Sequence, residues 1–266
     1  MIAHTRNPSL EPQAPCVFGP VHSRRLGRVI CAELVPHKVC TFDCIYCERG
    51  LTTRKTIMRD MYCDFPAVVA EIRELLHFEP DYIALTGAGE PLIQGQVNQL
   101  MQLIRTVTDV PIAVMSSGGL FWRADVRAEL MDADIVLPSL DAGDNATLQA
   151  VNRPHARIAV DDMIDGLIRF RRRFKGRPMW MRTTLVGGVN DTAESLDRIR
   201  RAVRRIGPDR LQIRTAVVPS MESSHVISPE RLESIVEYFG ENTEIIDEAA
   251  TAERSRGFRA LAAVAG

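Results

Sequence analysis

Three cysteines stand within eight residues, in the segment Cys40-Thr-Phe-Asp-Cys44-Ile-Tyr-Cys47. Thiolates at this spacing can bind three irons of a four-iron, four-sulfur cluster, which normally takes four cysteine ligands. The fourth iron is then left without a protein ligand. Because an iron with an open position can bind a substrate or a cofactor, the segment predicts a reactive [4Fe-4S] centre.

A zinc site is the alternative interpretation of these residues. Structural zinc takes four tetrahedral ligands, usually as two Cys or His pairs separated by a longer linker. His37 with Cys40 could form one pair and Cys44 with Cys47 the other. The three residues between the pairs leave little chain to wrap both around one ion, so the spacing favours the cluster.

Three further cysteines, Cys16, Cys31 and Cys63, lie outside this segment. A free cysteine is commonly a small buried hydrophobe, and Cys31 fits that description because it lies in an apolar run. A second cluster is the alternative, but it would need ligands closer together or a fourth partner. Disulfides are not expected, because the sequence begins without a secretion signal.

Polar or glycine-rich segments recur directly after apolar, strand-like runs. They are Thr86-Gly-Ala-Gly-Glu-Pro91, Ser116-Ser-Gly-Gly119, Pro138-Ser-Leu-Asp-Ala142 and Gly187-Gly-Val-Asn-Asp191. The hydroxyl of Ser117 and the flexible backbone around it suit a carboxylate or a ribose. The alternative for these segments is structural: a tight turn at 86–91, and helix N-caps or turns at Ser139, Asp141 and Asp191.

Apolar strand-like runs alternate with helical periods, and these elements must position the polar segments. The predicted strands are 29–36, 82–86, 112–115, 135–137, 179–185 and 211–217, and the predicted helices are 64–76, 97–107, 121–132, 163–168, 191–206 and 228–239. Residues 18–28 are predicted to be a loop leading into the first strand, and 37–52 the loop that carries the cysteines. Six strand-then-helix units indicate an α/β fold with a parallel sheet, whose site lies at the carboxyl ends of the strands.

The composition is that of an ordinary globular protein, with 266 residues, 45% hydrophobic and 25% charged. The net charge of -1 gives no basic field that would point to nucleic acid or to an anionic membrane surface. No window approaches the roughly 20 apolar residues of a membrane span, so a cytoplasmic protein without membrane partners is expected. The chain is divided into an N-terminal arm and basic loop (1–28), a core (29–247) and a C-terminal, helical tail (248–266).

The cysteine segment resembles the hallmark of the radical SAM superfamily, Cys-x3-Cys-x2-Cys with an aromatic residue, here Tyr46, before the last cysteine. Segment 86–91 resembles the Gly-Gly-Glu-Pro motif of that family, with Ala88 in place of the first Gly. Segments 18–28, 34–40 and 138–142 with 152–154 resemble a group related to the wyosine-tRNA synthase-like Fe-S oxidoreductases. True wyosine synthases carry three cysteines upstream of the main motif, whereas only Cys16 and Cys31 precede it here, so their tricyclic-base chemistry is not transferred.

This resemblance covers residues 29–220 and implies a partial (β/α)6 TIM-like barrel that binds a [4Fe-4S] cluster and S-adenosyl-L-methionine (SAM). Cys40, Cys44 and Cys47 are then the metal ligands. The resemblance also implies contacts with SAM. Tyr46 and the turn with Gly188 and Asn190 would lie near the adenine, and the turn with Gly87, Gly89, Glu90 and Pro91 would hold the methionyl amine. Ser139 and Asp141 would contact the ribose and the carboxylate, and the hydroxyl of Ser117 suits the same groups.

The function implied is reductive cleavage of SAM to a 5′-deoxyadenosyl radical, fed by a low-potential donor of flavodoxin or ferredoxin type. The radical would abstract hydrogen from a small-molecule or tRNA-nucleoside substrate beside Arg182, Arg214 and the arginines of the 24–28 loop. An activase or modifying enzyme acting on a partner protein or peptide is one alternative, and a non-catalytic metal-binding protein is another. Two basic runs, 169–177 and 198–205, are expected to lie on the solvated face of outer helices rather than to bind RNA.

Overall fold

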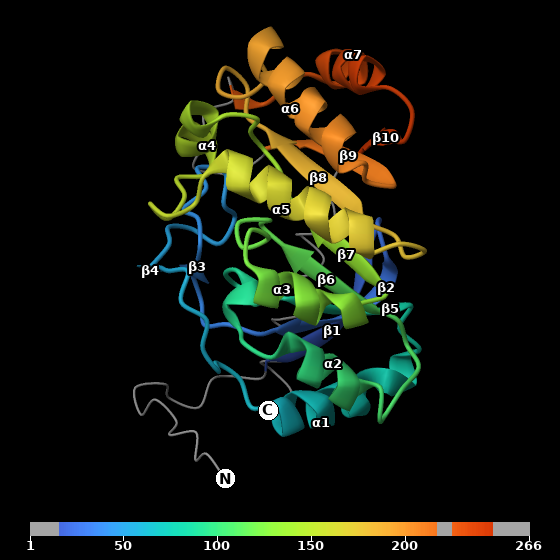
Figure 1. The fold of residues 1–266 in the computed structure, drawn as a ribbon. Coiled ribbons are helices and arrows are strands. Elements are labelled where there is room, and N and C mark those ends of the chain that lie inside the picture. The colour runs from blue at the N-terminus through green and yellow to red at the C-terminus, as the bar shows by residue number, and fades with distance from the viewer. Residues whose placement is uncertain (1–15, 217–224, 247–266) are drawn as a thin grey trace.

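The computed structural model describes residues 16–216 and 225–246, in which helices cover one face of a curved sheet (Figure 1). The strands are β1 (Val17–Ser23), β2 (Gly27–Glu33), β3 (Val39–Cys40), β4 (Arg54–Lys55), β5 (Tyr82–Thr86), β6 (Ile112–Ser116), β7 (Ile135–Pro138), β8 (Trp180–Leu185), β9 (Arg210–Thr215) and β10 (Thr243–Ile245). The α-helices are α1 (Phe65–Leu75), α2 (Val97–Ile104), α3 (Ala124–Glu129), α4 (Asn145–Val151), α5 (Val160–Arg173), α6 (Ala193–Ile206) and α7 (Pro229–Phe239).

The parallel strands follow one another in chain order around the sheet. One part runs β1-β2-β5-β6-β7 and the other β8-β9-β10, and two parallel bridges, Val136 with Met179 and Ser139 with Arg182, join β7 to β8. From β2 to β10 all neighbours are parallel, and β1 alone pairs antiparallel, with β2. The predicted α/β partial barrel of six β/α units is therefore confirmed.

The two edge strands of the sheet, β1 and β10, were not predicted. Residues 18–23, part of the predicted loop 18–28, belong with Val17 to β1, because Val17 and Val21 pack on the sheet while an irregularity between Phe18 and Val21 accommodates Gly19 and Pro20. Val17 of this strand packs in the larger apolar core. The short strand β10 was not predicted, and it pairs with β9 through three residues. The predicted arm at 1–15 and tail at 248–266 lie outside the described residues.

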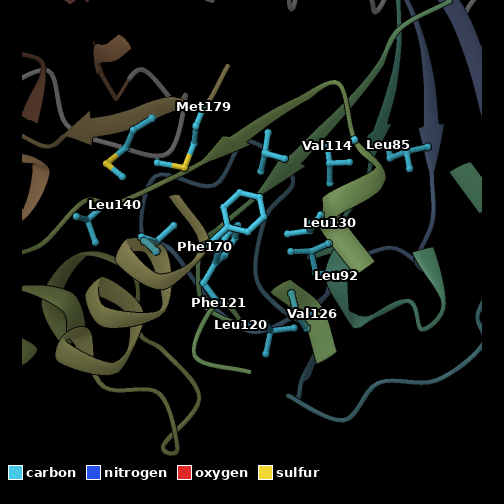
Figure 2. Packing of buried hydrophobic residues seen from close by; sticks show 14 of the residues in the cluster. Leu85, Leu92, Val114, Leu120, Phe121, Val126, Leu130, Leu140, Phe170 and Met179 are labelled. Atoms are coloured by element: carbon cyan, nitrogen blue, oxygen red, sulfur yellow. The ribbon is translucent and has the colours of Figure 1, made fainter. Parts of the chain in front are cut away.

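Apolar side chains form separate clusters on the two faces of the sheet. The larger cluster fills the space between sheet and helices, where Phe121 meets Phe170 edge to face at 5.3 Å between ring centroids (Figure 2). A smaller cluster on the concave inner face contains Leu26, Val29, Ala84, Ala113, Ile135 and Leu137, with Cys31 and Trp180 packed against it. Successive residues of a strand point to opposite faces, so cluster membership tells which side chains point into the barrel.

The basic runs lie on α5 and α6, outside the barrel (Figure 1). Both helices bury an apolar face, and their arginines form ion pairs within the chain, such as Arg201 with Asp197 and Arg205 with Asp165. This agrees with the predicted solvated faces. Within the described ranges no helix has both the length and the apolar character needed to cross a membrane.

Candidate functional site

The cysteine loop lies beyond the carboxyl end of β2 and is held by backbone hydrogen bonds to the segment after α4. Asp43 N donates to Asn152 O at 2.9 Å, and Ile45 N donates to Val151 O at 2.9 Å. His155 N donates in return to Thr41 O at 2.8 Å. These bonds tie the cysteine loop to the end of α4 and the residues that follow it.

The three predicted ligands, Cys40, Cys44 and Cys47, are half-buried and close enough for their charges to interact. Asn152 Nδ2 donates to the Cys44 sulfur at 3.3 Å, and the Lys38 ammonium donates to the Cys47 sulfur at 3.0 Å. Burial, with a smaller contribution from Glu90, raises the pKa of the Cys40 thiol to about 11. Burial also raises the pKa of Cys44, and the Asp141 charge adds to that rise.

The donor set fits an iron-sulfur cluster better than a single ion. Zinc would need its sulfur ligands about 2.3 Å from one point, and in the described part of the chain no three His, Cys, Asp or Glu side chains converge that closely. In a cluster each cysteine binds a different iron, so the sulfurs stay further apart. His37, the fourth ligand of the zinc alternative, has an exposed side chain.

A buried cation beside the cysteines supports the same assignment. Lys38 is 2% exposed, and the one hydrogen bond that its side chain makes among the described residues goes to Cys47. A buried ammonium is costly unless an anion lies next to it. A thiolate-ligated cluster held by these cysteines would supply that negative charge, and neutral thiols would not.

Asp141 connects the cysteine loop to two strands of the barrel. Its carboxylate accepts hydrogen bonds from the Tyr46 hydroxyl, from Asn152 Nδ2 at 2.7 Å and from Thr184 N at 2.8 Å. The helix-cap alternative does not apply to it, because Asp144 is the N-cap of α4. Burial raises the pKa of Tyr46, and the neighbouring Asp141 charge raises it further, so the phenol stays protonated.

The turn after β5 is pressed against the cysteine loop. A Cβ on Gly89 would lie 1.9 Å from the carbonyl oxygen of Val39, so only glycine fits. The Glu90 carboxylate is 1% exposed and accepts from Ser116 Oγ at 2.9 Å and from Ser117 N at 2.7 Å. Burial raises the pKa of Glu90. Glu90 therefore fastens this turn to the end of β6, and its contact with the SAM amine stays a prediction.

The two predicted arginines lie beside this network. Arg214 places its guanidinium 5.8 Å from the centre of the Tyr46 ring, donates to Thr184 Oγ1 at 3.2 Å and pairs with Glu48 at 3.2 Å. Arg182 donates to Ser139 Oγ at 3.2 Å. Arg214 thus lies near the carboxyl end of β9 and Arg182 in the middle of β8, and their place beside a substrate stays a prediction.

Other predicted site residues lie elsewhere. Asn190 is fully buried, and it donates to Asp141 O and Thr184 O and accepts from Val186 N, which indicates a structural role in place of a cofactor contact. Gly188 N donates to Asp191 Oδ1 at 2.7 Å within the same turn. The arginines of the 24–28 loop are at the start of β2, the end opposite the cysteines, so their predicted place at the barrel mouth was wrong.

The remaining cysteines do not form a second ligand set in the described residues. Cys31 faces the inside of the barrel, whereas Cys16 and Cys63 pack against the outer core. Two features of the site were not predicted from the sequence. One is the buried Lys38, and the other is the side-chain amide of Asn152, which links the Cys44 sulfur to the Asp141 carboxylate. Lys38 carried one signal, a lone lysine directly before the buried residue Val39.

A partial parallel barrel with a three-cysteine loop at the carboxyl end of its first parallel strand defines the class of protein. The chain belongs to the radical SAM superfamily, whose family model matches residues 34–213. It is 32% identical over 233 residues to the UPF0026 protein MJ1312 of Methanocaldococcus jannaschii, covering 86% of this chain and 71% of that protein.

Two further proteins are similar to this chain. It is 36% identical over 245 residues to a protein of Brachyspira hyodysenteriae named GTPase Obg. The match covers 91% of this chain but only 36% of the length of that relative. Among solved structures, TYW1 with a lysine-pyruvate adduct bound superposes with a TM-score of 0.63 at 15% identity, over 82% of this chain and 76% of TYW1. At that identity the likeness shows the fold alone.

Membership in the superfamily also gives the cofactors. Radical SAM proteins use a [4Fe-4S] cluster and SAM, they are enzymes, and they need a reductant. The cluster ligands, the SAM contacts and the substrate of this chain go beyond what membership shows.

Proposed function

We propose that this chain binds its [4Fe-4S] cluster through Cys40, Cys44 and Cys47 and cleaves SAM reductively in order to abstract hydrogen from a substrate. The substrate is a small molecule or a tRNA nucleoside. When bound, the cluster supplies the electron that splits SAM into methionine and the 5′-deoxyadenosyl radical. A donor of flavodoxin or ferredoxin type would reduce the cluster.

The protein's own residues would hold and orient the cofactors. Lys38 and Asn152 donate to cluster-ligand sulfurs and so orient them. The turn at Gly87–Pro91 lies against the loop and would receive the SAM amine, while Ser117, Ser139 and Asp141 line the ends of neighbouring strands. Tyr46, held by Asp141 and covered by Arg214, would contact the adenine. In this arrangement the chain positions SAM and excludes water.

One observation carries the proposal: in a loop with three cysteines at the carboxyl end of the sheet, a buried lysine donates to the sulfur of Cys47. A structural loop would gain nothing from burying that charge beside neutral thiols. An anionic cluster at the same place makes the arrangement favourable.

Anaerobic reconstitution with iron and sulfide, followed by dithionite and SAM, tests the proposal. The expected product is 5′-deoxyadenosine, measured by chromatography and mass spectrometry. Cys44→Ala should abolish it, whereas the matched control Cys63→Ala should keep it. Formation equal to that of Cys44→Ala would end the enzyme assignment. About four irons per chain are expected, and about eight would show a second cluster.

A further inference from the structure

The inner wall of the barrel has two chemically different halves. The strands from β2 to β7 present small or apolar side chains, among them Val29, Ala84, Ala113 and Leu137. The second half, β8 to β10, is polar. Trp180 packs in the inner cluster, and because side chains alternate along a strand, Arg182 and Thr184 share its face.

The register of the second half stacks these polar residues in layers. Trp180 pairs with Arg210, Arg182 pairs with Gln212, and Thr184 pairs with Arg214. On the other side of β9, Glu244 pairs with Gln212. Arg214 lies in the layer that meets Tyr46, so Gln212 lies one layer further from the cysteine loop. Two residues along a strand correspond to roughly 6.6 Å.

A cavity of about 160 Å³ opens at this lower level. It is lined by Arg24, Arg25, Trp180, Arg210, Gln212, Glu244, Ile245 and Ile246. Three arginines and one glutamate therefore surround it. A cavity of about 150 Å³ holds a benzene-sized molecule, so there is room for a small oxyanion with a few further atoms.

Gln212 indicates what kind of ligand the cavity would bind. It is 1% exposed, and its Nε2 donates to Glu244 Oε1 at 2.8 Å, which fixes the orientation of the amide. The carbonyl oxygen Oε1 has no hydrogen-bond partner among residues 16–216 and 225–246. An unpaired buried acceptor is costly, and a ligand with an O–H or N–H donor would satisfy it. Guanidinium groups bind oxyanions well, through paired donors.

We propose that this cavity binds a small oxyanion that also donates a hydrogen bond, such as a protonated phosphate group, and that it anchors the anionic end of the substrate. The second part rests on the proposed function. Arg182, the neighbour of Gln212 on β8, donates to Ser139 at the cofactor end of the barrel. A small molecule held at Gln212 would thus point along the inner wall toward the cysteine loop.

Phosphate and sulfate form a matched pair of probes for the cavity. Both are tetrahedral anions of similar size, but at neutral pH only phosphate carries an O–H donor. Binding to the full chain is measured by calorimetry in a buffer without other oxyanions. Phosphate is expected to bind about tenfold more tightly than sulfate, because sulfate leaves the Gln212 carbonyl unpaired.

Three variants assign the result to residues. Gln212→Met should remove the preference for phosphate, Arg210→Gln should weaken both anions, and Arg172→Gln on the outer face of α5 should change neither. Circular dichroism checks that each variant is folded. The site would be overturned if phosphate did not bind. It would also be overturned if both anions bound weakly and neither Gln212→Met nor Arg210→Gln changed their affinity, which would mean an adventitious ion only.

The substrate role is tested on the reconstituted enzyme. A metabolite extract is split by anion exchange, and the retained fraction is expected to raise 5′-deoxyadenosine formation above its basal level, with phosphate competing. Stimulation confined to the unretained fraction would overturn this role. Failure of the proposed function is distinguishable, because it abolishes basal 5′-deoxyadenosine, whereas phosphate binding needs neither cluster nor SAM.

Discussion

The ammonium nitrogen of Lys38 lies 3.0 Å from the sulfur of Cys47, and Lys38 is only 2% exposed. Hydrogen bonds and positive charge at a ligand sulfur stabilise the reduced cluster, which carries more negative charge. Lys38→Met should therefore shift the midpoint potential of the reconstituted cluster to a more negative value, as measured by electron paramagnetic resonance during a redox titration.

The control for this prediction is Lys38→Arg, which keeps the positive charge and should stay nearer the wild-type potential. Iron content should remain about four per chain in both variants, because the three thiolate ligands are unchanged. A Lys38→Met protein that holds its cluster at the wild-type potential would show that the lysine does not act on the cluster.

Gly89→Ala should disturb the cysteine loop, because the added Cβ would lie 1.9 Å from the backbone oxygen of Val39. Overpacking of this kind lowers the free energy of unfolding by about 1–3 kcal/mol. Gly95→Ala is the matched control, since its Cβ would meet its nearest atom, Asp60 O, at an ordinary 3.6 Å. Urea titrations of the metal-free proteins and iron assays after reconstitution measure both effects. Equal stability and iron content in the two variants would contradict the prediction.

The thiol of Cys40 should react slowly with iodoacetamide in the metal-free protein at neutral pH. Burial raises its pKa to about 11, so the folded protein keeps the proton that the reactive thiolate must lose. Below that pKa the thiolate fraction, and with it the alkylation rate, should rise about tenfold per pH unit. Iron loading should improve with pH for the same reason. Peptide mass spectrometry follows the modification, and a rate that levels off by about pH 9 would refute the raised pKa.

Arg59 should be a major stabilising residue outside the site. Its side chain is 8% exposed, its guanidinium pairs with both oxygens of Glu129 at 2.8 and 2.5 Å, and it also donates to Asp125 and to two backbone carbonyls. Arg59→Ala should lower the free energy of unfolding by about 3–5 kcal/mol, since it leaves the partly buried Glu129 carboxylate without its cation and with only the hydrogen bond from Val97 N.

Arg105→Ala provides the comparison for Arg59, because Arg105 and Asp134 are both more than a third exposed. An exposed pair of this kind contributes about 0–1 kcal/mol. Chemical denaturation of both variants measures the difference. Similar losses in the two would show that burial does not set the strength of the Arg59 contacts.

The regular elements of the fold were predictable because local pattern and tertiary packing agree there. The strand 82–86 has its predicted bounds, and Thr192 and Ser228 begin helices as their side chains indicate. The strand β1 was missed because Gly19 and Pro20 resemble a turn, and only pairing with β2 across an irregularity makes it a strand.

The parts of the candidate site that belong to a local sequence motif were predictable. The parts that depend on contacts between distant segments were less so. The spacing of the cysteines predicts which loop would bind a metal, but nothing local shows that Asn152 reaches Cys44 or that Lys38 is buried. Asn190 was placed on the cofactor by analogy, whereas its bonds to Asp141 O and Thr184 O place it behind the wall of the site. These outcomes depend on contacts between distant segments, which a local pattern does not contain.

The cysteine loop takes its backbone partners from residues 151–155, and Cys44 and Asn152 are 108 residues apart in the chain. Ribosomes add about 5–20 residues per second, so roughly 5 to 20 seconds pass between the synthesis of the loop and that of its support. During that interval the nascent polypeptide presents three thiols without shelter from oxygen or from stray metal ions. A cluster bound by these thiols, as proposed, would therefore meet a completed loop only after residue 155 has been translated.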